Sequence, residues 1–173
     1  YEIKEGVTFD RHTLFSLLIL NRKTMKSKVN EIQISYKDKI ALSKSQAIKS
    51  STDAGKLLFE TWDKNTIGLQ ESFKVLLLNN SNKVKGIYEL SKGGITGTLV
   101  DIRILFAVVL KSVSVAIILS HCHPSGKLLP SEADKKLTDK IKNAAAFFDV
   151  KVLDHIIVIP SGEYYSFSDE GIL

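Results

Sequence analysis

The stretch "SVAIILSHCHPSGKLLPSEAD", residues 114–134, contains the strand and the helix around which we expect this chain to fold. It opens with a short apolar, partly β-branched run over residues 114–120, which predicts a buried central strand. The Pro-Ser-Gly sequence of residues 124–126 then ends the strand and turns the chain. Beyond Pro130, "SEADKKLTDKIKNAAAFF" predicts a long helix with Ser131 at its cap. A buried strand that leads through a turn into a helix is the building unit of an α/β fold.

The segments on either side extend this unit into a mixed sheet. Upstream, two strand-like runs, "FKVLLLN" and "KVKGIYEL", are joined by the turn residues "NNSN" and predict a β-hairpin. Apolar residues at helical spacing then predict a helix over residues 101–111. Downstream, residues 150–159 predict another strand, and "PSGE" turns the chain into a final "YYSFS". We expect an α/β fold in which helices sandwich a mixed β-sheet.

The chain divides into three parts by its patterns. Residues 1–24 are interpreted as a leader or non-native segment, because the chain begins with Tyr1 and its only methionine is Met25. The apolar run "LFSLLIL" resembles a short signal sequence, but "NRKTMK" follows it instead of small residues suited to cleavage, so export is the less favoured interpretation. Residues 25–69 are expected to form a lead-in, with an edge strand over 31–37 and a helix over 49–63 that opens at Ser51 or Thr52. Residues 70–173 are expected to form the main domain.

Composition limits the classes of function. The hydrophobic fraction of 44% and the charged fraction of 25% are those of a globular protein, and no apolar run is long enough to span a bilayer. The net charge of +5 comes from residues 1–50, with ten Lys/Arg against five Asp/Glu, whereas residues 51–173 carry fourteen of each. A solvated helix face therefore explains the lysines of residues 135–142 better than a nucleic-acid surface. The single cysteine, Cys122, fits a reducing compartment, and we expect a cytoplasmic protein without a membrane partner.

The end of the central strand carries a candidate metal site. Alternate residues of a strand point the same way, so His121 and His123 face one side while Cys122 faces the other. The turn lets the next helix return over the strand end, where Ser131 and Asp134 lie three residues apart on nearly the same side. Two imidazoles and a carboxylate suit zinc with a fourth position open to water.

Each half of this pattern also has a purely structural explanation. An isolated His-x-His is usually unremarkable, and Ser-x-x-Asp is a good helix start, with Ser131 as the cap and Asp134 as the acid of a capping box. The two halves joined at this spacing, after a buried strand, favour a metal site.

The joined pattern, His-x-His followed after seven residues by Ser-x-x-Asp, resembles the JAMM signature of the JAB/MPN metallopeptidases. "HCHPSGKLLPSEAD" is similar to the bacterial RadC branch in particular, which usually reads His-Asn-His, so Cys122 departs from the pattern. The resemblance extends over about residues 70–173, through "ESFKVLLLNNSNKV", "GGITGTLVDIRILF", "VLDHIIVI" and "YYSFSDEGIL". It implies a JAB/MPN, cytidine-deaminase-like fold.

The resemblance also implies a hydrolase site. His121, His123 and Asp134 would bind Zn²⁺, Ser131 would help to hold an oxyanion, and Glu71 would take a proton from the attacking water. Zinc acidifies water and polarises a carbonyl, so the implied reaction is hydrolysis of a peptide or isopeptide bond. Nothing in the sequence identifies the substrate.

Two further residues have open interpretations. His155, in "LDHIIVI", is either a core histidine or a residue that supports the metal site from behind. Arg103 matches a recurring arginine of the branch, but a helix-surface arginine is the simpler interpretation.

The alternative function is a DNA-associated factor, because the RadC name is linked with DNA repair and the chain is basic. It would bring a weak association with nucleic acid, but the chain contains nothing that resembles a DNA-binding motif. A nucleobase deaminase would need His-x-Glu followed by Pro-Cys-x-x-Cys, and the chain contains neither.

Overall fold

A computed structural model describes residues 41–94 and 97–173 of the chain. The leader interpretation of residues 1–24 and the strand expected over residues 31–37 lie outside the described residues.

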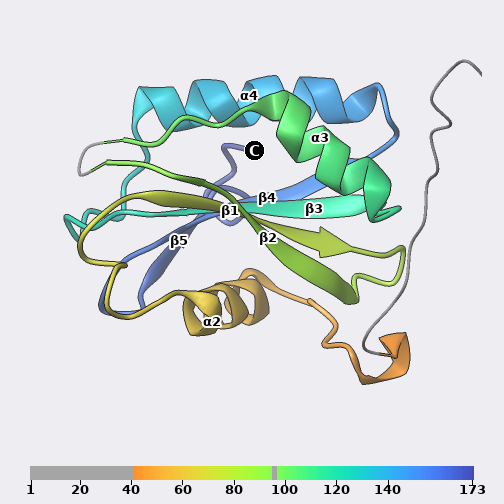
Figure 1. The fold of residues 1–173 in the computed structure, drawn as a ribbon, viewed down its shortest axis with the longest axis horizontal. Helices are drawn as coiled ribbons and strands as arrows, with labels where there is room; N and C mark the ends of the chain where they lie inside the picture. Colours follow the sequence, from red (N-terminus) through yellow and green to blue (C-terminus); the bar gives the residue numbers. More distant parts are fainter. Residues whose placement is uncertain (1–40, 95–96) are drawn as a thin grey trace, which may run out of the picture. The chain divides into compact units, whose positions relative to one another are not determined.

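Five strands form one mixed sheet in the order β2-β1-β3-β4-β5 (Figure 1). Their bounds are β1 Ser72–Leu78, β2 Val84–Lys92, β3 Ala116–Cys122, β4 Lys151–Val158 and β5 Tyr164–Ser166. β3 and β4 pair in parallel, whereas the other neighbouring strands pair antiparallel. The expected hairpin is confirmed as β1 and β2, and the expected central strand is confirmed as β3.

Helices cover both faces of this sheet (Figure 1). Their bounds are α2 Ser51–Thr61, α3 Ile102–Lys111 and α4 Glu132–Ala146, and a short 3-10 turn, η1, spans Leu42–Lys44. α2 packs on one face through a cluster that contains Leu58 and Trp62, and α3 and α4 pack on the other through a cluster that contains Leu105 and Ile141. The predicted sandwich is therefore confirmed. None of the helices in the described part of the chain combines the length and the apolar character needed to cross a membrane.

The two middle strands owe their continuous apolar sequences to this double cover. Every residue of β1 and of β3 is buried, because side chains on both faces meet a helix layer. β2 lies at the sheet edge, and none of its residues is fully buried. The sequence of β3 thus marks the centre of the fold, which is where the candidate site begins.

The structure corrects two boundaries of the sequence analysis. α2 is capped by Ser50, not by Ser51 or Thr52, because Ser50 has extended backbone angles and its Oγ accepts a hydrogen bond of 3.2 Å from the Asp53 N–H. The central strand runs over Ala116–Cys122 instead of residues 114–120. A hydrogen-bonded turn with Val113 at a φ of 50° precedes it, so the strand starts later and reaches past His121.

We expect Leu58→Ala to lower the free energy of unfolding by about 2–5 kcal/mol, because Leu58 of α2 is completely buried against the sheet. Urea denaturation followed by circular dichroism measures this change. Lys56→Ala, at an exposed position of the same helix, is the matched control and should stay within about 0.5 kcal/mol of the wild type. Equal costs for the two variants would contradict the packing of α2 in the core.

Candidate functional site

Three side chains converge where β3 ends and α4 begins. His121 is in β3, His123 follows the strand directly, and Asp134 is in the first turn of α4. His121 Nε2 lies 2.9 Å from His123 Nε2 and 3.3 Å from Asp134 Oδ1, and His123 Nε2 lies 3.8 Å from Asp134 Oδ2. Within the described residues these three form the one group of His, Cys, Asp and Glu side chains that could hold a metal ion. The structure therefore brings together all three residues that the sequence suggested as ligands.

The pleat of β3 sorts neighbouring side chains onto opposite faces. The His121 ring lies on the face covered by α4 and stacks on Phe73, with ring centroids 6.2 Å apart and planes at 6°. Cys122 points to the α2 face, where its Sγ accepts a hydrogen bond of 3.3 Å from the Ser72 N–H and donates one of 3.4 Å to the Gln70 carbonyl. The cysteine that departs from the family pattern is thus a packing residue, as the alternation predicts.

The turn after β3 keeps His123 in line with the strand. The His123 N–H donates to the Val158 carbonyl at 2.9 Å, so the parallel pairing with β4 continues for one residue beyond β3. Gly126 then adopts a φ of 76°, which favours glycine, and its N–H closes the turn on the His123 carbonyl at 3.1 Å. The chain reverses within a few residues and delivers the start of α4 to the strand end.

Ser131 and Asp134 form a capping box at that helix start, as the sequence predicts. Asp134 Oδ2 accepts hydrogen bonds from the Ser131 N–H at 2.7 Å and from the Ser131 hydroxyl at 2.6 Å. These bonds fix the carboxylate so that Oδ1 faces His121. The capping explanation and the ligand explanation of this motif are therefore compatible, because one carboxylate serves both.

A second set of contacts holds the two imidazoles from behind. His123 Nδ1 lies 2.5 Å from the Lys127 carbonyl, and His121 Nδ1 lies 2.8 Å from Nε2 of the fully buried His155. His155 Nδ1 in turn lies 2.6 Å from the hydroxyl of Thr138. His155 is thus confirmed as a core residue, and it also contacts His121 directly, while its support of a metal site stays a prediction. Thr138 was missed by the sequence analysis, although its spacing of four residues from Asp134 places it on the same side of the helix.

Glu71 and Ser131 line the same cavity as the three clustered residues, a space of about 280 Å³. Glu71 precedes β1, and its backbone pairs with the loop after β2, through N–H to the Gly94 carbonyl at 3.0 Å and through its carbonyl to the Gly93 N–H at 2.8 Å. Within the described residues Glu71 lies outside the three-residue cluster. It is placed to face the cavity without joining the candidate ligands.

Charge and burial act in opposite directions on the titrating groups. Burial opposes ionisation of Asp134, but hydrogen bonds from His121 and His123 outweigh it and hold the pKa of this carboxyl far below its usual range. Burial also opposes protonation of His123, but hydrogen bonds to Asp134 and to the Lys127 carbonyl, with the charges of Asp134 and Glu71, raise the pKa of this imidazole. At neutral pH the cluster therefore contains an ionised carboxylate.

The donor set and its spacing fit a zinc ion. Bonds of about 2.0–2.1 Å to a tetrahedral zinc place the ligand atoms roughly 3.3 Å apart. The two imidazole nitrogens lie 2.9 Å apart, and the carboxylate of Asp134 approaches His121 Nε2 to 3.3 Å through Oδ1 and His123 Nε2 to 3.8 Å through Oδ2. With one ligand atom taken from each residue, all three atoms lie within 4.8 Å of one another, which is close enough for one ion. Two imidazoles and one carboxylate are a usual ligand set for a catalytic zinc site, which leaves a fourth position open.

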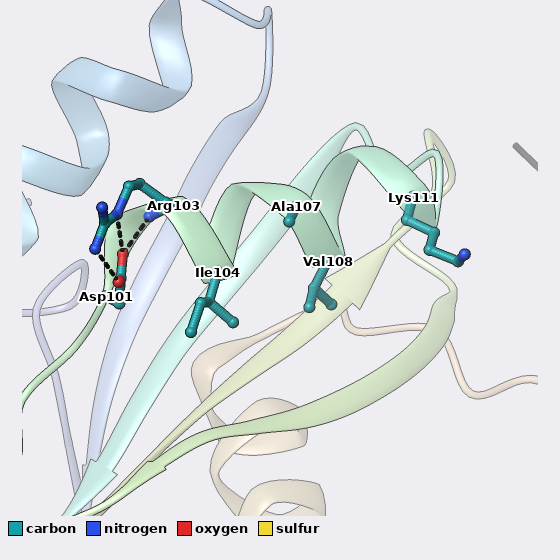
Figure 2. A pocket seen from close by; sticks show the side chains of 6 residues that line it. All are labelled: Asp101, Arg103, Ile104, Ala107, Val108 and Lys111. Carbon is teal, nitrogen blue, oxygen red and sulfur yellow. Dashed lines mark hydrogen bonds and ion pairs between the residues drawn. The ribbon is translucent and has the colours of Figure 1, made fainter. Parts of the chain in front are cut away.

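Arg103 lies apart from this cavity, on the surface of α3. Its side chain is 91% exposed and pairs with Asp101, the cap of α3, with 2.6 Å between Nη2 and Oδ2. Figure 2 shows the pair at one end of a shallow surface groove whose other lining residues are Ile104, Ala107, Val108 and Lys111. The hydrogen bonds from Arg103 lower the pKa of Asp101 to about 2. The interpretation of Arg103 as a helix-surface residue is confirmed.

Comparison with known proteins links the fold and the site to one family. Residues 48–172 match the family model described as the RadC-like JAB domain. A UPF0758 protein of Flavobacterium johnsoniae is 56% identical over 102 residues, which cover 59% of this chain and 44% of the relative. A UPF0758 protein of Porphyromonas gingivalis is 42% identical over 104 residues, covering 60% of this chain and 46% of the relative. The chain thus spans less than half the length of these curated relatives.

We expect His123→Ala to remove most of the bound zinc from the protein, because it deletes one of three candidate ligands and leaves only two protein groups to hold the ion. Elemental analysis of protein purified after loading with zinc measures the metal per chain, which should be close to one in the wild type. Lys140→Ala, an exposed change in α4, is the control and should keep the wild-type zinc content. A wild type that cannot be loaded with zinc would disprove the site.

Proposed function

This chain belongs to the RadC-like JAB domain family, and on that basis we propose that it is a zinc-dependent hydrolase that cleaves a peptide or isopeptide bond. His121, His123 and Asp134 would hold the zinc ion. The ion would supply Lewis-acid chemistry, lowering the pKa of water and polarising the carbonyl of the substrate. The observation that carries the proposal is the position of Glu71 and Ser131 in the same cavity as these three ligands.

In this proposal Glu71 is the general base. Glu71 directly precedes β1, its backbone is held by two hydrogen bonds to the loop after β2, and the residue lines the cavity. It would accept a proton from the attacking water and deliver it to the leaving amine. The charge of Glu71 is the last of the influences that raise the pKa of His123, and Glu71 lines the same cavity as this imidazole.

Ser131 would contribute a hydrogen bond to the developing oxyanion. Its hydroxyl proton is engaged with Asp134 Oδ2 at 2.6 Å, and the Ser131 N–H holds the same oxygen at 2.7 Å. The hydroxyl could rotate towards a substrate while the N–H keeps the carboxylate in place. This arrangement supports a role for Ser131 in binding the transition state that does not weaken the ligand position of Asp134.

Glu71→Gln separates the base from the ligands. The substitution keeps the shape but removes the proton acceptor, so zinc content should persist while turnover falls by about 10²-fold to 10⁴-fold. Asp134→Ala deletes a ligand and the capping acid together, so zinc and activity should be lost in parallel. Activity is measured with zinc-loaded protein on a panel of fluorogenic peptides and lysine-linked isopeptides, and zinc content by elemental analysis.

Three results would count against the proposal. Full activity in Glu71→Gln would mean that another group is the base. Loss of zinc in Glu71→Gln would make Glu71 a ligand or a structural residue. A zinc-loaded wild type that cleaves no member of the panel would remove the support for peptide or isopeptide hydrolysis.

A further inference from the structure

A buried row of three polar side chains runs behind the candidate site, from His121 through His155 to Thr138. We infer that Thr138 and His155 are positioning residues, which hold the proton of His121 on Nδ1 and so turn the lone pair of its Nε2 towards the metal position. The inference rests on the metal site of the proposed function, but it is independent of the bond that is cleaved.

The direction of the hydrogen bonds follows from the far end of the row. The Thr138 hydroxyl lies 2.6 Å from the main-chain carbonyl of Asp134 and 2.6 Å from His155 Nδ1. A carbonyl can only accept, so the single hydroxyl proton of Thr138 must point to Asp134. The Thr138 oxygen therefore accepts the hydrogen bond at its other contact. His155 Nδ1 must be the protonated nitrogen that donates this bond.

The next bond in the row is then determined. His155 has no exposed surface and lies between the rings of Phe73 and Phe167, whose centroids are 5.6 and 4.6 Å away. Its two nitrogens contact a hydroxyl and another imidazole, so a charge on this fully buried ring would have no carboxylate partner, and the ring holds one proton only. Its Nε2 is consequently an acceptor, and His121 Nδ1, 2.8 Å away, must donate to it.

The lone pair of His121 follows from this order. A neutral imidazole protonated on Nδ1 has its lone pair on Nε2, the atom that faces His123 Nε2 at 2.9 Å and Asp134 Oδ1 at 3.3 Å. His123 is directed in the same way, because its Nδ1 lies 2.5 Å from the Lys127 carbonyl, which can only accept. Once the Nε2 protons that bond Asp134 in the metal-free protein are lost, both rings therefore turn a lone pair towards the ion position.

His121 is supported by an imidazole, that of His155, whereas His123 is supported by a carbonyl, that of Lys127. This difference is the reason why Thr138 matters. A carboxylate or a carbonyl behind a metal-binding histidine can only accept a hydrogen bond, so it needs no further direction. A neutral imidazole can carry its proton on either nitrogen and can therefore present either a donor or an acceptor. The hydroxyl of Thr138 selects the useful tautomer of His155. The row also adds no negative charge beside the ligands, in contrast to a carboxylate in the same place.

Thr138→Val and Thr138→Ser form the decisive pair of variants. Valine keeps the branched shape but removes the acceptor for His155 Nδ1–H, so the proton of His155 is free to move to its Nε2. His155 Nε2–H would then donate to His121 Nδ1, and the lone pair of His121 would lie on Nδ1 instead of Nε2. We expect the apparent zinc affinity to weaken by about 10-fold to 100-fold in Thr138→Val, the usual effect of losing such a supporting group. Thr138→Ser keeps the hydroxyl and should bind zinc within a few-fold of the wild type. Competition with a chromophoric chelator measures the affinities, and thermal unfolding verifies that both variants fold.

A spectroscopic measurement on the metal-free protein tests the proton order directly. The chain has four histidines, so ¹⁵N-histidine labelling gives few imidazole signals to assign. Long-range ¹H–¹⁵N spectra should show a proton on Nδ1 of both His121 and His155 in the wild type and in Thr138→Ser. Thr138→Val should shift both rings towards the Nε2–H form.

The outcomes separate this inference from the proposed function. Wild-type zinc affinity in Thr138→Val, or a wild-type His121 without a proton on Nδ1, would overturn the inference whatever the protein cleaves. Failure to cleave peptides or isopeptides, with the tautomers and affinities as expected, would reject the proposed function and leave the inference standing.

Discussion

The parallel pairing of β3 with β4 is the constraint on which the site depends. Two adjacent parallel strands cannot be joined by a tight turn, so the chain must cross over the sheet, and here it does so through α4. The crossover begins directly above the carboxyl end of β3, which brings Asp134 to His121 and His123. In the same pairing His155 of β4 lies opposite Leu119 of β3, two residues before His121 in that strand. One topological feature thus supplies the third candidate ligand and the support behind the first.

Within this arrangement Asp134 connects local and tertiary structure. Its carboxylate completes the capping box with Ser131, which stabilises the start of α4, and it also faces both imidazoles. Its main-chain carbonyl accepts the hydrogen bond from Thr138 that ends the row behind His121. The helix start, the candidate ligand set and the proton order of the supporting row are therefore coupled through a single residue. A change at this position alters all three together.

The two faces of the sheet have separate tasks. The face covered by α3 and α4 contains His121, His155 and Phe73, whereas the face covered by α2 contains Cys122 in a purely packed environment. This separation explains how Cys122 can depart from the family pattern without altering the ligand cluster. α2, which the sequence analysis assigned to a lead-in, forms part of the core, and the family match that starts at residue 48 includes it. The division of the chain at residue 70 remains a prediction.

The periodic and local features of this protein could be predicted from its sequence. Continuous apolar runs identified β1 and β3, the alternation of a strand predicted that His121 and Cys122 face opposite sides, and Ser131 with Asp134 predicted the capping box, because each of these depends on residues close together in the chain. The residues that lie behind the candidate ligands could not be predicted in this way. His155 and Thr138 are 17 residues apart, and His155 is 34 residues from His121, so no spacing rule connects them and their contact arises from the crossover and the strand register.

The choice of Ser50 over its neighbours as the cap of α2 also depends on tertiary contacts, because the hydroxyls of Ser51 and Thr52 turn to Tyr164 of β5 instead. Several adjacent hydroxyl residues suit a helix cap equally well in the sequence, and packing selects one of them.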